Sequence, residues 1–171
     1  MATMRWLTTT FSTVAIAVAL AAPAVADAST DGWGLNGTFK ATSVGNWAQT
    51  NDVYHDETGV TSTWTIATTC SSRVDCSGQV NSDAGWTAPI YTRSGEWLVK
   101  RALPHWEHCR DDTTADGLQT YRFYPADFTG RAQPEGRTTF IGWDKTVAPS
   151  GACGINQPLV INMPFQLAPI S

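Results

Sequence analysis

Alternation between apolar and polar residues is clearest in two segments of the chain, Val60–Thr68 and Leu159–Leu167. Apolar side chains recur there on one parity, and a period of two is typical of a strand with one buried and one solvated face. Pro164 falls within the second segment. Because proline has no N–H to donate, we expect an incompletely paired strand edge or a bulge at that point.

Other segments rich in β-branched and aromatic residues are bounded by Gly, Pro or Asn and predict further strands, for a total of about eight. They are Gly37–Ser43, Ser77–Ser82, Thr87–Tyr91, Glu96–Leu103, Leu118–Tyr124 and Thr138–Trp143. Links as short as residues 93–95 favour hairpins, so the pattern predicts an all-β antiparallel meander. A meander of this size closes into a small barrel, with a two-sheet sandwich as the alternative. Val44–Gly59 has no clear period and is expected to form a long loop or a short helix.

The N-terminal segment has the features of an export signal. Arg5 precedes an apolar stretch from Trp6 to Leu20, and the small residues Ala24 and Ala26 suit a signal peptidase that cleaves after Ala26. A retained membrane anchor is the alternative, but a membrane span needs roughly 20 apolar residues and this stretch is shorter and contains Thr and Ser. We therefore expect a signal-peptide helix within residues 1–26, and a single secreted β domain over residues 27–171.

The four cysteines, Cys70, Cys76, Cys109 and Cys153, all follow the predicted signal. An even number in an exported chain predicts two disulfides, and three pairings are possible. Cys70 and Cys76 bracket a short polar turn, so a hairpin would bring them together and leave Cys109 to pair with Cys153. A zinc site is disfavoured because no C-x-x-C spacing occurs.

Charge limits the class of partner. The chain has 15 Asp and Glu against 11 Lys and Arg, a formal net charge of −4. Nucleic acids and anionic membranes require a cationic face, so we expect neither as a partner. No motif indicates a cofactor. A small ligand or a component of the cell envelope remains the expected partner.

Two resemblances add to this interpretation. Gly37-Thr38-Phe39 and Gly45-Asn46-Trp47 resemble the G-x-W strand that opens the barrels of calycins, the lipocalin and avidin superfamily, which implies a ligand cavity without catalysis. A longer set of segments resembles a family of small secreted mycobacterial proteins, which implies export and no particular activity. Its segments are Leu35–Ser43, Ser82–Trp86, Trp97–Arg101 with Pro104, Trp106 and Cys109, and Ser150–Gly154.

Four residues are candidates for ligand binding: Trp47, Trp97, Arg101 and Tyr121. Arg101 shares the parity of Trp97 and therefore points into the predicted barrel, where it needs a carboxylate or a group of carbonyls. A strand-end arginine that reaches water is the structural alternative. The first hypothesis is thus a non-enzymatic secreted binding protein whose small barrel takes an apolar or anionic ligand.

Two other functions compete with that hypothesis. Exposed aromatics such as Trp86 and Trp106 would suit a module that binds the cell wall or another protein. His105, Glu107 and His108 are weak candidates for a metal site in a metal-assisted enzyme, because they converge only if their strand breaks. His55-Asp56-Glu57 offers a base without a recognisable nucleophile, so no catalytic residue is predicted.

Overall fold

The structure is a computed structural model that describes residues 34–127, 129–133 and 139–170. The predicted signal peptide and its cleavage site at Ala26 lie outside the described residues. Within them, no helix is long and apolar enough to cross a membrane.

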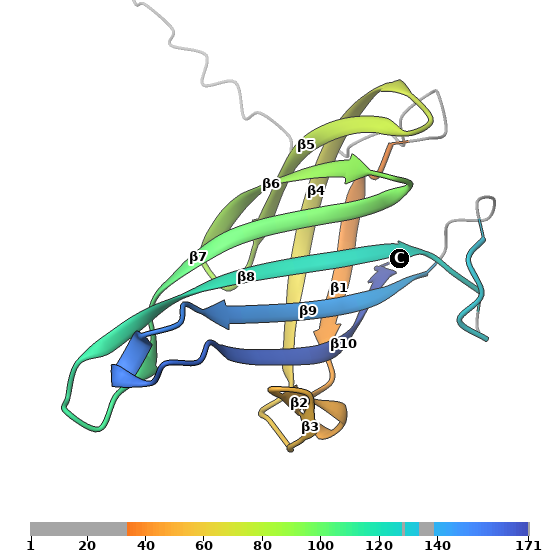
Figure 1. The fold of residues 1–171 in the computed structure, drawn as a ribbon. Helices are drawn as coiled ribbons and strands as arrows, with labels where there is room; N and C mark the ends of the chain where they lie inside the picture. Colours follow the sequence, from red (N-terminus) through yellow and green to blue (C-terminus); the bar gives the residue numbers. More distant parts are fainter. Residues whose placement is uncertain (1–33, 128, 134–138, 171) are drawn as a thin grey trace, which may run out of the picture.

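Eight antiparallel strands form a closed barrel (Figure 1). Six consecutive hairpin pairings join β4 to β10. β1 pairs with β4, and the pairing of β1 with β10 closes the sheet. The predicted meander and barrel are confirmed, and the sandwich alternative is not formed. The barrel strands are β1 (Gly37–Ser43), β4 (Val60–Ser72), β5 (Asp75–Ser82), β6 (Trp86–Arg93), β7 (Glu96–His108), β8 (Thr114–Pro125), β9 (Phe140–Ala148) and β10 (Leu159–Pro169).

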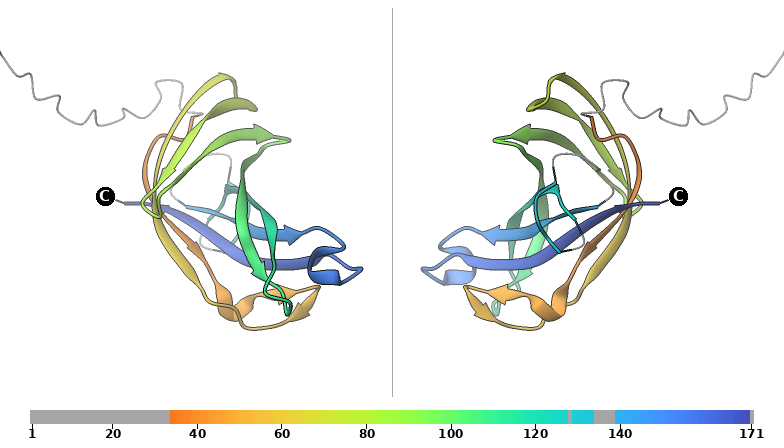
Figure 2. Two further views of the ribbon diagram at one scale, coloured as in Figure 1. Left: turned by 90° about the vertical axis from the view of Figure 1, so that its left-hand side faces the viewer. Right: turned by 90° about the vertical axis from the view of Figure 1, so that its right-hand side faces the viewer.

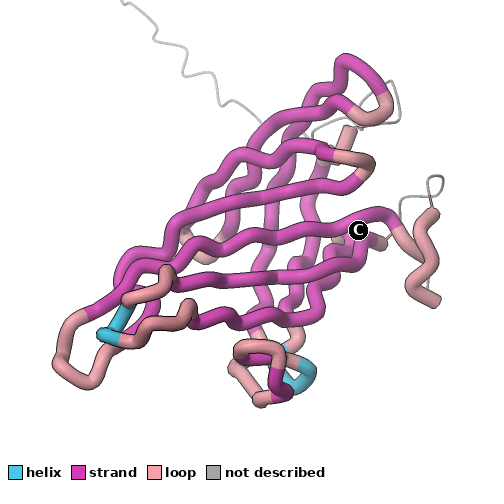
Figure 3. Tube along the Cα trace, viewed as in Figure 1, coloured by secondary structure: helices cyan, strands magenta, loops and turns pink. Residues whose placement is uncertain are grey.

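The segment without periodicity forms a small lobe at one end of the barrel (Figures 1 and 3). It contains the 3₁₀ turn η1 (Gly45–Trp47) and a short hairpin of β2 (Gln49–Thr50) and β3 (Val53–Tyr54). β10 pairs with β1 from Phe165 onwards and with β2 at Ile161 and Asn162. Pro164 lies between the part of β10 that pairs with β1 and the part that pairs with β2. Its carbonyl oxygen accepts the backbone N–H of Val44 at 2.9 Å. The edge at Pro164 is therefore incompletely paired, as its missing donor predicts.

Several strands are longer than their alternation indicates. β7 continues to His108 across an irregularity in its pairing with β8 between Leu103 and Glu107. His105 has a φ of 56° within that irregularity. Such a bulge reverses the parity of the side chains, so a search for a period of two ends the strand too early.

Both disulfides have the pairing that the hairpin argument favours. Cys70 and Cys76 lie opposite each other on β4 and β5 and are bonded. Cys109 is bonded to Cys153, which lies in the 3₁₀ turn η2 (Ala152–Gly154) between β9 and β10. The second bond therefore ties the β7–β8 loop to the β9–β10 loop.

Aromatic rings fill the middle of the barrel. Trp64 is fully buried, and its ring centroid lies between 4.8 and 6.5 Å from those of four other aromatic side chains. Edge-to-face and tilted contacts of this kind stabilise beyond the area they bury. The rings around Trp64 are Trp86, Tyr121, Phe123 and Phe165.

Candidate functional site

Polar side chains on the inner face of the barrel form one hydrogen-bonded chain. Arg101 on β7 donates its Nε–H to Oε1 of Gln119 on β8, at 2.6 Å. Gln119 donates its amide to both carboxylate oxygens of Asp144 on β9, at 2.8 and 3.0 Å. The hydroxyl of Ser43 on β1 donates to Oδ2 of Asp144 at 2.7 Å. Side chains from four strands are thus joined across the interior.

Arg101 is half-buried, and its contacts are with neutral groups. Its guanidinium carbon lies 4.5 Å from the ring centroid of Trp86, in a cation–π contact, and it also hydrogen-bonds to the Tyr121 hydroxyl. The ion pairs among the described residues involve other side chains. A guanidinium has five N–H donors, more than these neutral partners accept, so Arg101 can still bind an anion.

Burial sets the protonation of the groups around Arg101. Desolvation raises the pKa of Asp144, while hydrogen bonds from Ser43 and Gln119 and the charge of Arg101 oppose the shift. Desolvation also raises the pKa of Tyr121, and the neighbouring Asp144 adds to that effect. Tyr121 therefore keeps its proton at neutral pH and presents a neutral hydroxyl to Arg101.

The barrel wall is unpaired beside Arg101. β6 and β7 pair only from Ile90 opposite Val99 to Arg93 opposite Glu96, next to the turn that joins them. Continuing this register would place Ala88 opposite Arg101, but no pairs form there within the described residues. Figure 2 shows β6 and β7 separating from that turn. Arg101 and Trp86 therefore contact each other across the part of the wall where two strands part.

Two of the four predicted ligand residues meet in this region, and two do not. Arg101 and Tyr121 are in contact. Trp97 is buried in the core cluster, where it packs as a structural side chain. Trp47 lies in η1, outside the barrel, with 62% of its surface exposed. The grouping predicted from the sequence is therefore only half realised.

Sequence reasoning missed the partners of Arg101. Gln119 lies two residues from Tyr121 and therefore points inward as well. A polar residue on the apolar side of that predicted strand could have indicated a buried polar partner. Asp144 lies one residue beyond the predicted end of its strand at Trp143. Ser43 is the last residue of a predicted strand, where polar residues are common and do not indicate a buried contact.

The other singled-out residues lie apart from this chain of hydrogen bonds. His105 accepts or donates at Nδ1 to the Thr114 hydroxyl at 2.7 Å, and its backbone N–H donates to Asp116. The described residues contain no group of three or more His, Cys, Asp or Glu side chains placed to hold a metal ion, so His105, Glu107 and His108 are not gathered. Trp106 is half-exposed and covers Gly117, where an added Cβ would lie 2.9 Å from its ring.

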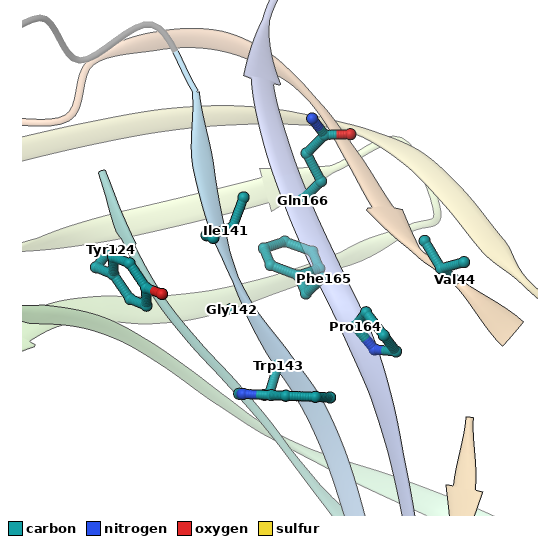
Figure 4. Close-up of a pocket in the computed structure, with 8 residues that line it drawn as sticks. All are labelled: Val44, Tyr124, Ile141, Gly142, Trp143, Pro164, Phe165 and Gln166. Carbon is teal, nitrogen blue, oxygen red and sulfur yellow. The ribbon is translucent and has the colours of Figure 1, made fainter. Parts of the chain in front are cut away.

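A shallow groove of about 370 Å³ lies on the outer wall of the barrel (Figure 4). Gly142 on β9 is one of its lining residues, and a Cβ there would lie 1.9 Å from the carbonyl oxygen of Arg122 on β8. The two backbones approach closely at this point, and Trp143 beside it has 48% of its surface exposed. The groove is lined by Val44, Tyr124, Ile141, Gly142, Trp143, Pro164, Phe165 and Gln166.

No family model matches the chain, and no curated protein matches it. Among solved structures, the monomer form of the PknI sensor domain of M. tuberculosis is similar, with a TM-score of 0.55 and 14% sequence identity. The match covers 80% of this chain and 88% of that one. At this identity the likeness concerns the fold, so this chain shares its barrel architecture with a sensor domain.

Proposed function

We propose that this protein is a non-enzymatic binding domain that works outside the cytoplasm and holds a small organic carboxylate at Arg101. The observation that carries the proposal is a half-buried guanidinium with neutral partners, placed where β6 and β7 are unpaired. A cation in such a place has lost part of its hydration, while the Asp144 carboxylate is reached only through Gln119 and not by direct contact. A bound anion supplies the missing charge.

Carboxylate suits this position because the planar guanidinium offers parallel N–H donors that match two carboxylate oxygens. Stacking on Trp86 and the bond to Gln119 hold that plane in one orientation, so little side-chain entropy is lost when the ligand binds. Trp86 also provides an apolar surface beside the cation, since it is only partly buried against the core. A carboxylate with an aromatic or aliphatic body fits both features.

The compartment follows from covalent chemistry. Two disulfides persist in oxidising surroundings and are reduced in the cytosol, which supports an extracellular or cell-envelope location. The solved structure of similar fold is a sensor domain, which agrees with a role without catalysis. The resemblance to small secreted mycobacterial proteins agrees with export and stays a prediction.

Titration with sodium benzoate and sodium octanoate tests the proposal. The indole N–H signal of Trp86 in a ¹H–¹⁵N spectrum should shift on binding, and calorimetry should give the affinity. Arg101→Gln should weaken binding by about tenfold or more, because a charge-assisted hydrogen bond is worth about 1.5–3 kcal/mol. Arg122→Gln is the matched control, since Arg122 is exposed and pairs with Glu96 instead. Absence of any shift with both probes, or equal binding by Arg101→Gln, would overturn the proposal.

A further inference from the structure

The outer wall around the groove is basic, although the whole chain is acidic. The chain has a formal net charge of −4. The outward positions of β9, β10 and β1 nevertheless carry Lys145 and Lys40 and, among the described residues, no Asp or Glu. These outward positions therefore carry a net positive charge.

Strand register places the cations around the groove. Trp143 lies between Arg122 on β8 and Pro164 on β10. The neighbouring outward row contains Lys145 with Lys100, on either side of Thr120. Outward residues two apart on a strand are about 7 Å apart, and strands lie about 4.8 Å apart, so both ammonium groups can reach a ligand seated on Trp143.

Acids near this wall are hydrogen-bonded or paired within the chain. Asp83 accepts the backbone N–H of Thr63, which lies opposite Lys40 on β4. Glu96 on β7 is occupied by Arg122, and Asp116 accepts the backbone N–H of His105. Glu57 accepts the hydroxyl of Thr50 in the β2–β3 lobe, where β10 leaves the wall. Lys40, Lys100 and Lys145 are exposed and stand without a carboxylate partner among the described residues.

We propose that this surface, the basic wall formed by Lys40, Lys100, Trp143, Lys145 and Gln166, binds an acidic polysaccharide. The apolar face of a sugar ring stacks on the exposed indole of Trp143, as ring faces do on aromatic side chains. Carboxylates on the sugars pair with Lys145 and Lys100, and the Gln166 amide, exposed at the groove, bonds to hydroxyls. This function is separate from that of Arg101, which lies on the inner face.

Polygalacturonate is the probe, with dextran as a neutral polysaccharide and polyphosphate as a polyanion without sugar rings. The purified protein should bind polygalacturonate, with an affinity that falls as salt increases because the lysines are exposed. Trp143→Ala should weaken binding about tenfold, and Lys145→Gln about threefold. Arg110→Gln removes the same charge from an exposed loop position and should change nothing. Arg101→Gln should also bind polygalacturonate as the wild type does, which separates this result from the carboxylate site.

Four results would overturn the proposal: no binding to polygalacturonate, equal binding to dextran, equal binding to polyphosphate, or unchanged binding by Trp143→Ala. Equal binding to polyphosphate would show that charge alone attracts the probe. Trp143→Phe keeps an aromatic face and should retain most of the affinity, so it checks that stacking is the cause. Circular dichroism of each variant confirms that the barrel is intact.

Discussion

Gln119 holds both carboxylate oxygens of Asp144 through its amide nitrogen, at 2.8 and 3.0 Å, while its carbonyl oxygen accepts Arg101. A neutral amide on β8 thus lies between the cation on β7 and the acid on β9. Its orientation is determined by its neighbours, because the amide must donate toward the acid and accept from the guanidinium. The outer donors of Arg101 stay available as a result.

Gln119→Leu should destabilise the barrel by about 1–3 kcal/mol, because it leaves Asp144 and Arg101 in the interior without their shared partner. Urea unfolding followed by tryptophan fluorescence measures the change. Thr120→Val is the control, since Thr120 lies next in sequence on the outward parity of β8. Equal stabilities of Gln119→Leu and the wild type would show that the polar chain contributes nothing.

Asp144 makes the folded state sensitive to pH with a defined sign. Its pKa is raised above the ordinary value of 3.8 in the folded state, so the folded protein binds this proton more tightly than the unfolded chain. Its contribution to stability is therefore greatest at low pH and is lost as pH rises from about 4 through the folded pKa. Asp144→Asn removes this loss.

The free energy of unfolding of Asp144→Asn, relative to that of the wild type, should consequently be higher at pH 7 than at pH 4. Urea titrations of both proteins at the two pH values measure this difference in unfolding free energy. The effects of the other carboxyl groups are the same in both proteins and cancel. Asp127 shows why the comparison is needed. Hydrogen bonds, chiefly from the Thr129 side chain, lower its pKa to about 2, so its titration also affects stability but does so equally in both proteins. A difference that stays constant or falls with pH would contradict the assignment.

Removal of the two disulfides should have unequal costs. Cys109 and Cys153 are 44 residues apart and Cys70 and Cys76 are 6 apart. Cross-linking the longer loop restricts the unfolded chain more, so the pair of serine substitutions at Cys109 and Cys153 should cost about 4 kcal/mol against about 2 kcal/mol for the other pair. Thermal unfolding of the two double variants compares them, and equal melting temperatures would count against the entropic account.

Gly142→Ala should destabilise the barrel by about 1–3 kcal/mol through overpacking. The added Cβ would meet the Arg122 carbonyl oxygen at 1.9 Å, and a backbone atom cannot move aside as a flexible side chain does. Gly59→Ala is the milder comparison, because its Cβ would lie 3.3 Å from the Ser43 carbonyl oxygen, which would need to move by only a few tenths of an ångström. Urea unfolding should show a larger loss of stability for Gly142→Ala than for Gly59→Ala, and equal losses would contradict the overpacking account.

Periodicity in the sequence was sufficient to locate the strands that have one apolar and one polar face. β1 begins and ends at the predicted residues, and β4 and β10 begin where alternation starts. It was insufficient at the bulge near His105, where parity reverses, and in the lobe between β1 and β4, where the strands have two residues each. Two-residue strands are too short to show a period.

The sequence by itself determined the all-β class, because alternation decides which face of each strand is buried. It also favoured the observed disulfide pairing among three possible ones, because a hairpin would bring Cys70 and Cys76 together and leave Cys109 for Cys153. Only the tertiary structure decided which polar side chains meet. Arg101, Gln119, Asp144 and Ser43 come from four strands, and their contacts depend on the register of each strand pair and on barrel closure. Register is a relationship between segments distant along the chain, and no local pattern contains it.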